Sequence, residues 1–207
     1  MNTKYPASQP VPLNGFETFV AGKLNAGFQV VDFWSWSFSS LLNNVTRGHL
    51  AEFIVARALD IADGVRQEWA NYDLLLKVPA RPDVKIEVKS AAYFQEWKQE
   101  ELSTIQFSIR KTKAFDVENG CREDTARRQS DVYVFALLSP KIDKPAVNPL
   151  DLSQWDFYVV PTSTLDRLAP GQASISLSIL TDEKSELHTP KTDFFKLHAA
   201  VVAAACG

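Results

Sequence analysis

Two stretches of the chain carry the clearest patterns of apolar and polar residues. Residues 131–138 (DVYVFALL) are almost entirely apolar, which is typical of a strand that is buried on both faces. Residues 84–89 (VKIEVK) alternate strictly between apolar and charged side chains, which predicts a strand with one buried and one polar face. We therefore expect a sheet in which residues 131–138 form a central strand.

Helices are expected on both sides of these strands. Residues 47–59 are apolar on nearly all sides, so they predict a buried helix, for which Thr46 is a candidate cap. Asp32 is a candidate cap for an earlier, aromatic-rich helix, and the alanine-rich residues 194–205 predict a last one. Further strands are expected at residues 72–78, 103–109 and 157–160.

This order of helices and strands predicts one mixed α/β (α+β) domain. The prolines and the glycine within the first 15 residues break regular structure. We therefore expect a flexible N-terminal arm over residues 1–25 and a single domain over residues 26–207.

The apolar faces of the two hairpin strands predict how these strands pair. Setting Val78 opposite Val84 aligns both apolar faces and leaves a proline-rich turn between them. In this register Asp73 lies opposite Lys89, on the same face as Glu87. Because cross-strand neighbours are about 5 Å apart, these three charged side chains converge on one patch.

Two carboxylates at this spacing can hold a divalent cation between them. Mg²⁺ keeps several waters when protein carboxylates bind it, and one such water can become a nucleophile. A neighbouring lysine can orient or deprotonate that water, or stabilise charge on a phosphate. Asp73, Glu87 and Lys89 would then form a site for phosphodiester hydrolysis. Alternating charge on a strand is, more often, the mark of an ordinary solvated face, so this pattern alone leaves both interpretations open.

The order of acidic residues along the chain favours the metal site over an ordinary solvated face. Asp73 is followed after thirteen residues by Glu87-Val88-Lys89-Ser90, and the buried helix expected upstream carries Glu52. This arrangement resembles the PD-(D/E)XK nuclease superfamily, although Tyr72 stands where that pattern has proline. The resemblance covers about residues 30–165, and strings such as IEVKSAAY and FYVVPTSTL are similar to an uncharacterised bacterial group within that superfamily.

The resemblance implies a fold, a reaction and a cofactor. The fold is a restriction-endonuclease-like core, in which a central mixed sheet is flanked by helices. The reaction is that of an endonuclease that depends on Mg²⁺, with Mn²⁺ as an alternative cation. Asp73 and Glu87 are implied as metal ligands, Lys89 lies near the attacking water, and Glu52 reaches the metal directly or through water.

Glu52 and His49 lie one turn apart on the same face of the predicted helix. A lone buried carboxylate is unfavourable, so Glu52 needs a cation, either the metal or one of the arginines Arg47 and Arg57. His49 is a candidate for contact with a phosphate, or else a plain surface histidine. The three histidines of the chain are widely scattered, which argues against a histidine–metal nuclease.

Several residues are candidates for contacts to nucleic acid, with DNA expected first and RNA as an alternative. Tyr93 follows the lysine strand and could stack on a base, although core packing is the more frequent role of an aromatic side chain. Residues 110–128 carry six basic side chains that could neutralise phosphates, but interleaved acids make an ordinary solvated loop equally plausible. The predicted contacts are His49, Ser90, Tyr93, Arg110, Lys111, Arg127 and Arg128.

Composition and charge limit these interpretations. The chain has 207 residues, of which 45% are hydrophobic and 23% charged, so a disordered chain is excluded and a single core is expected. A net charge of -3 argues against nonspecific coating of nucleic acid, so any DNA surface must be local. Cys121 and Cys206 make neither a disulfide framework nor a four-ligand zinc site. Without a long apolar run or a signal segment, we expect a cytoplasmic protein with no membrane partner.

Two further expectations stay open. A non-catalytic nucleic-acid-binding or assembly module of the same fold would keep the hairpin without using a metal, and the acidic net charge favours this alternative. Trp34 and Trp36 are more typical of packing than of recognition, but an exposed pair would indicate a dimer face, so a homodimer is left open.

Overall fold

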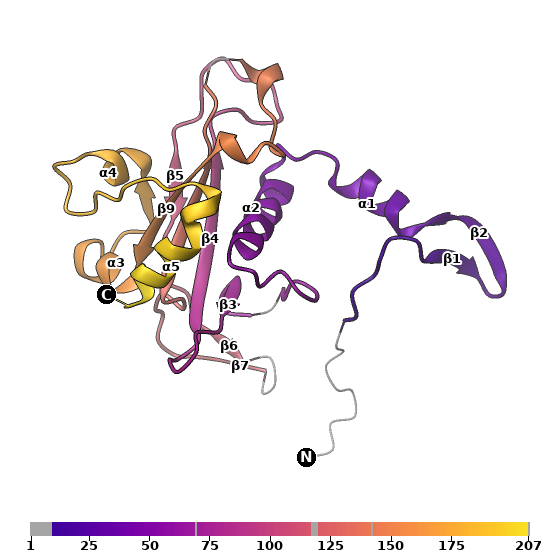
Figure 1. The fold of residues 1–207 in the computed structure, drawn as a ribbon, viewed down its shortest axis with the longest axis horizontal. Coiled ribbons are helices and arrows are strands. Elements are labelled where there is room, and N and C mark those ends of the chain that lie inside the picture. The colour runs from indigo at the N-terminus through magenta and orange to yellow at the C-terminus, as the bar shows by residue number, and fades with distance from the viewer. Residues whose placement is uncertain (1–9, 69, 117–119, 142, 207) are drawn as a thin grey trace.

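A mixed sheet with helices on both sides organises the chain (Figure 1). Among the residues described there are five α-helices, one four-stranded mixed sheet and small two-stranded sheets, so the prediction of a mixed α/β fold is confirmed. None of the helices described has both the length and the apolar character that a bilayer span requires. The computed structural model describes residues 10–68, 70–116, 120–141 and 143–206.

The central sheet has the strand order β3, β4, β8, β9. β4 and β8 run parallel, and both outer pairs are antiparallel. Every residue of β8 is buried, which confirms the prediction of a central strand. The bounds of these strands are Leu74–Leu76 for β3, Val84–Ala92 for β4, Val132–Leu138 for β8 and Trp155–Pro161 for β9.

Helices α2 (Asn44–Ala58) and α5 (Leu197–Cys206) cover one face of the sheet. Val55 of α2 is completely buried against this face, as the nearly all-apolar pattern of the helix predicts. The helix begins earlier than expected, because Asn43 and not Thr46 is its cap. The Asn43 side chain accepts a hydrogen bond of 3.0 Å from the backbone N–H of Val45.

A second hydrophobic cluster fills the other face of the sheet. Phe135 of β8 packs there against Phe107, with ring centroids 4.9 Å apart. Because β8 carries side chains into both clusters, it has no polar face, and this explains its unbroken apolar sequence. The elements that cover this face are β5 (Gln106–Ser108), β10 (Ser174–Ser176), α3 (Thr162–Leu168) and α4 (Leu177–Thr181).

The β3–β4 hairpin pairs two residues away from the predicted register. Val84 lies opposite Leu76 and not Val78, so the turn is wider than expected. Pro79 and Pro82 lack the N–H groups that would extend the ladder, and Ala80 adopts a left-handed backbone conformation with φ of 60°. A shift of two residues keeps the apolar and charged faces as predicted, because side chains alternate with a period of two.

The first described residues form a folded projection and not only a loose arm. Strands β1 (Thr18–Ala21) and β2 (Leu24–Gln29) pair as a hairpin, and α1 (Val30–Phe38) follows directly. Asp32 lies inside α1, where its carboxylate accepts a hydrogen bond of 2.7 Å from the backbone N–H of Gln29, the residue that caps the helix. Figure 1 shows these elements extending away from the sheet. Residues 1–9 of the predicted arm lie outside the described residues.

Short elements make up the remaining connections. The charged segment between β5 and β8 contains the small hairpin of β6 (Phe115–Asp116) and β7 (Cys121–Arg122). Single turns of 3₁₀ helix occur at Lys144–Ala146, Leu152–Gln154 and Phe194–Lys196.

Arg128 anchors the segment that leads into β8. Its side chain is fully buried, and its guanidinium donates hydrogen bonds of 2.9 Å to the carbonyl oxygen of Ile109 and 2.8 Å to that of Ala169. It also forms an ion pair with Asp166 of α3. One side chain therefore ties the residues after β5 to the end of α3.

We expect Arg128→Met to lower the free energy of unfolding by at least about 2 kcal/mol, because two buried carbonyl oxygens lose their donors. Urea unfolding followed by tryptophan fluorescence measures this loss. The matched control is Arg127→Met, which changes an exposed neighbour and should alter stability by no more than about 0.5 kcal/mol. Equal effects of the two substitutions would contradict the anchoring role.

Candidate functional site

Asp73 lies where β3 separates from β4. Its backbone N–H donates a hydrogen bond of 3.0 Å to the carbonyl oxygen of Ile86. The next hydrogen bond to β4 is made by its side chain and not by the backbone: Oδ2 of Asp73 accepts a hydrogen bond of 2.8 Å from the backbone N–H of Val88. This contact fixes a half-buried carboxylate beside the middle of β4. Continuing the β3–β4 register places Asp73 opposite Glu87, and not opposite Lys89 as predicted.

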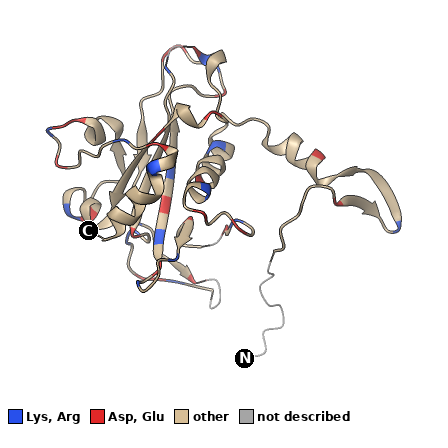
Figure 2. Cartoon of the chain, viewed as in Figure 1, with Lys and Arg blue, Asp and Glu red and all other residues tan. Residues whose placement is uncertain are grey.

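Glu87 and Lys89 form an ion pair on the polar face of β4. Both side chains are half-buried, with exposed fractions of 20% for Glu87 and 31% for Lys89. Ser130, just before β8, donates a hydrogen bond of 3.3 Å from its hydroxyl to Oε2 of Glu87. Figure 2 shows the alternation of basic and acidic residues along β4. The predicted convergence of Asp73, Glu87 and Lys89 is therefore present, in the shifted register.

The electrostatics of this patch favour an added cation. Burial, together with the charge of Glu87, raises the pKa of Asp73 to about 6, although Lys89 acts in the opposite direction. Burial acts to lower the pKa of Lys89, but the carboxylates of Glu87 and Asp73 outweigh it and raise that pKa. Two carboxylates thus share one lysine, and the positive charge present is too small to offset the effect of burial on the pKa of Asp73.

Glu52 approaches the same patch from α2 but has a cation of its own. Arg66, in the loop between α2 and β3, makes two hydrogen bonds to the Glu52 carboxylate, including one of 3.0 Å from Nη2 to Oε1. The alternative partners expected for Glu52 were Arg47 and Arg57. Arg47 instead donates to the carbonyl oxygen of Leu42 at 3.0 Å, among other contacts. The expectation that a buried Glu52 needs a cation holds, but the arginine is a different one.

A cavity of about 510 Å³ is lined by both Asp73 and Glu52. His49 and Arg66 also line this cavity, so His49 faces the same side as Glu52, as the helical spacing predicts. Glu87 and Lys89 are not among the lining residues. Asp73 is therefore the residue that connects the cavity to the charged face of β4.

The carboxylates fit a magnesium site with few protein ligands. Within the described part of the chain, no three His, Cys, Asp or Glu side chains come together as a ready-made metal cage. Glu52 is paired with Arg66 and Glu87 with Lys89, but Glu87 acts more strongly on Asp73, so the candidate donor pair is Asp73 and Glu87. Mg²⁺ commonly takes only one or two protein carboxylates and keeps several waters, so two carboxylates suit its chemistry.

The basic segment after β5 lies beside the loop that carries Asp73. Asn71 makes two hydrogen bonds with the backbone of Phe115, of 2.8 Å and 3.0 Å, and these join the loop to β6. Arg110 and Lys111 are both exposed in the same segment. Their predicted contact with nucleic acid is therefore compatible with their position, and it stays a prediction.

Other predicted contacts to nucleic acid lie elsewhere. Arg128 is buried and bound by backbone carbonyl groups, so this prediction is wrong: its guanidinium is not accessible to a phosphate. Arg127 is exposed and pairs with Glu123 at 3.2 Å. Ser90 lines a different cavity, together with Arg47. Tyr93 follows the end of β4, where Lys141 lies 4.5 Å from its ring centroid.

Three residues of this region were missed by sequence reasoning: Arg66, Ser130 and Asn71. Each lies in irregular structure, where no periodicity reports the direction of a side chain. Ser130 directly precedes β8, and β8 pairs with β4, which carries Glu87. Pairing these two strands from their sequence patterns was the one signal that could have placed Ser130 near Glu87. Arg66 and Asn71 act through contacts that only the folded loop creates.

Comparison of the chain with protein-family models, with curated proteins and with solved structures gives no match. The function proposed below therefore rests on the geometry of this chain's own residues and on the motif that they form.

The raised pKa of Asp73 predicts a pH-dependent effect on stability. The folded protein holds the Asp73 proton more tightly than the unfolded chain, so stability falls as pH rises from the ordinary value of 3.8 to about 6. Asp73→Asn keeps an oxygen that can accept from Val88 but carries no charge. Above pH 6 the metal-free variant should be more stable than the native chain by about 1–3 kcal/mol.

Urea unfolding in EDTA across this pH range measures the difference. The two proteins should converge at acidic pH, where Asp73 is protonated in both states. A constant difference at every pH would contradict the raised pKa.

Proposed function

We propose that the chain is a magnesium-dependent nuclease that hydrolyses phosphodiester bonds in DNA. The observation that carries this proposal is the meeting of Asp73, Glu87 and Lys89 where β3 separates from β4. Two carboxylates share a half-buried patch with a single lysine, and burial, together with the charge of Glu87, raises the pKa of Asp73. A divalent cation at this patch would relieve the repulsion between the two carboxylates.

Each residue has a role that follows from its position. Asp73 and Glu87 would hold the cation, and Asp73 would lose its proton when the cation binds. Bound Mg²⁺ supplies a polarised water and positive charge next to a phosphate. Lys89 has a raised pKa and stays protonated, so its role is to stabilise charge on the phosphate and not to remove a proton.

The order of elements supports a restriction-endonuclease-like core. A buried helix, α2, precedes the antiparallel β3–β4 hairpin, and the next long strand, β8, runs parallel to β4. The acid-x-lysine motif lies on β4, and the first acid lies directly before β3, as the resemblance to the PD-(D/E)XK superfamily implies.

The segment after β5 is the candidate substrate surface. Arg110 and Lys111 are exposed, and the segment that holds them is joined to the Asp73 loop through Asn71. Such a local basic surface can neutralise phosphates although the net charge of the chain is -3. His49 lies in the cavity beside Asp73 and is a further candidate for phosphate contact.

A non-catalytic nucleic-acid-binding module is the second candidate. The observation in its favour is that the charges are already paired: Arg66 binds Glu52, and Lys89 binds Glu87. Such a module would bind DNA without cleaving it and without any dependence on Mg²⁺.

Cleavage assays separate these two functions. With Mg²⁺ or Mn²⁺, we expect the native chain to cleave DNA, and Glu87→Gln and Lys89→Met to reduce the rate about 100-fold or more. Supercoiled, linear and single-stranded DNA should be compared with RNA of the same sequence, and fluorescence anisotropy should measure binding in parallel.

The matched control is Lys85→Met. Lys85 lies on the same face of β4 but is exposed, with its ammonium 5.7 Å from the centroid of the Tyr72 ring, so its loss should leave cleavage unchanged. DNA binding without cleavage by the native chain would support the module. Cleavage that is equal in all variants would contradict the assignment of these residues.

A further inference from the structure

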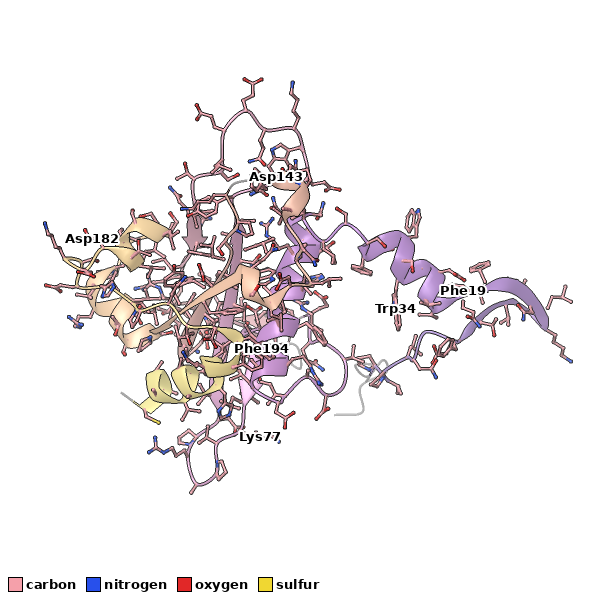
Figure 3. The ribbon with its side chains drawn as sticks, turned by 45° about the horizontal axis from the view of Figure 1, so that its top comes forward. Phe19, Trp34, Lys77, Asp143, Asp182 and Phe194 are labelled. Carbon is pink, nitrogen blue, oxygen red and sulfur yellow. The ribbon has the colours of Figure 1, made fainter. Side chains whose placement is uncertain are left out.

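The projection formed by residues 10–38 exposes an unusually apolar surface. Seven aromatic side chains between Phe16 and Phe38 are from 37% to 85% exposed, and Trp36 is the most exposed of them. Aliphatic side chains such as Val11 and Leu24 are also more than 70% exposed. Figure 3 shows Phe19 and Trp34 on this projection, on opposite sides of the junction between its hairpin and its helix.

The projection has a defined internal structure. Phe19 and Phe28 stack across the hairpin with ring centroids 4.6 Å apart. The backbone N–H of Val31 donates a hydrogen bond of 2.9 Å to the carbonyl oxygen of Gly15, which joins α1 to the segment before β1. Gly15 has a φ of 93° and lies against the Trp34 ring, where a Cβ atom would come within 3.0 Å of a ring carbon. The exposed aromatic side chains therefore belong to a segment that is held together by its own contacts.

The rest of the described part of the chain does not cover this surface. Both hydrophobic clusters are built from residue 42 onward, and no residue of α1 is buried. At about 200 Å² for each aromatic side chain and about half exposed, the seven rings present roughly 700 Å². Summed over all sides of the projection, this aromatic area is comparable with the roughly 800 Å² that each partner buries in a stable interface.

The charges and hydrogen bonds of the projection indicate what kind of partner it fits. Its charged residues are Glu17, Lys23 and Asp32 alone, so it offers neither a basic surface for nucleic acid or anionic lipid nor a charge pattern for a charged protein (Figure 2). Among the residues that the structure describes, the β1–β2 sheet has two strands, so each strand has one unpaired edge. A two-stranded hairpin is at best marginally stable alone, and it gains stability from further strands or an apolar partner.

From these observations we propose that the projection is a dimerisation element that packs against the projection of a second copy of this chain. A two-fold contact brings the same uncharged aromatic surface from both copies together, so shape and polarity match without any complementary charge. Interfaces of this size have Kd values from the micromolar to the picomolar range, so we expect a dimer with a Kd of about 1 μM or tighter. This inference does not depend on the proposed nuclease activity.

Sedimentation equilibrium of the full chain tests the proposal. We expect twice the monomer mass at micromolar concentration, and we expect Trp36→Glu to weaken the dimer at least about 100-fold, because one substitution removes an anchor and adds a charge in both copies. Phe16→Glu should also weaken the dimer. Because Phe16 lies outside α1, this second variant shows that the loss does not come from damage to that helix. Circular dichroism should show that both variants keep the native fold.

The matched control is Phe195→Glu, which changes an equally exposed aromatic side chain outside the projection. It should leave the dimer unchanged. A native chain that stays monomeric at all concentrations would overturn the proposal, as would a dimer that resists both Trp36→Glu and Phe16→Glu. Flotation of a monomeric chain with phosphatidylcholine vesicles, lost in Trp36→Glu, would also overturn it and would assign the surface to a lipid bilayer.

Discussion

The hydrogen bond from the backbone N–H of Val88 to the Asp73 carboxylate determines the arrangement of the proposed site. A backbone carbonyl would ordinarily accept from an N–H at this position of a ladder. With a side chain in that place, β3 diverges from β4 while a carboxylate stays fixed beside the strand. The same contact brings Asp73 close to Glu87. Burial, together with repulsion from the Glu87 carboxylate, raises the pKa of Asp73 to about 6. The hydrogen bond therefore sets the geometry of the patch, while burial and the charge of Glu87 raise the pKa of Asp73 against it.

The sequence predicts the elements of the sheet well because their patterns come from simple burial. The alternation in residues 84–89 and the apolar run at 131–138 report which faces are covered, and both correspond to strands in the structure. Even a register error of two residues left Asp73, Glu87 and Lys89 on one patch, because side-chain direction repeats every two residues. A register error of one residue would have separated them.

Other features of the site could not be predicted, because they arise from loops. The width of the β3–β4 turn depends on two prolines and on the backbone of Ala80. The cation that neutralises Glu52 comes from Arg66, which no helical spacing relates to Glu52. Arg128 has the sequence context of a solvated loop, yet its guanidinium is buried because carbonyl groups from two distant segments converge on it. Charge in a sequence does not distinguish a surface arginine from a structural one.

The most direct test of the central claim is the binding of a divalent cation to the purified chain. Titration with Mn²⁺, followed by electron paramagnetic resonance, measures binding without any assumption about substrate. We predict a site that is lost in Asp73→Asn and in Glu87→Gln, is retained in Lys85→Met, and becomes tighter as pH rises through about 6, where Asp73 loses its proton. Absence of binding, or binding that is the same in all four proteins, would contradict the account.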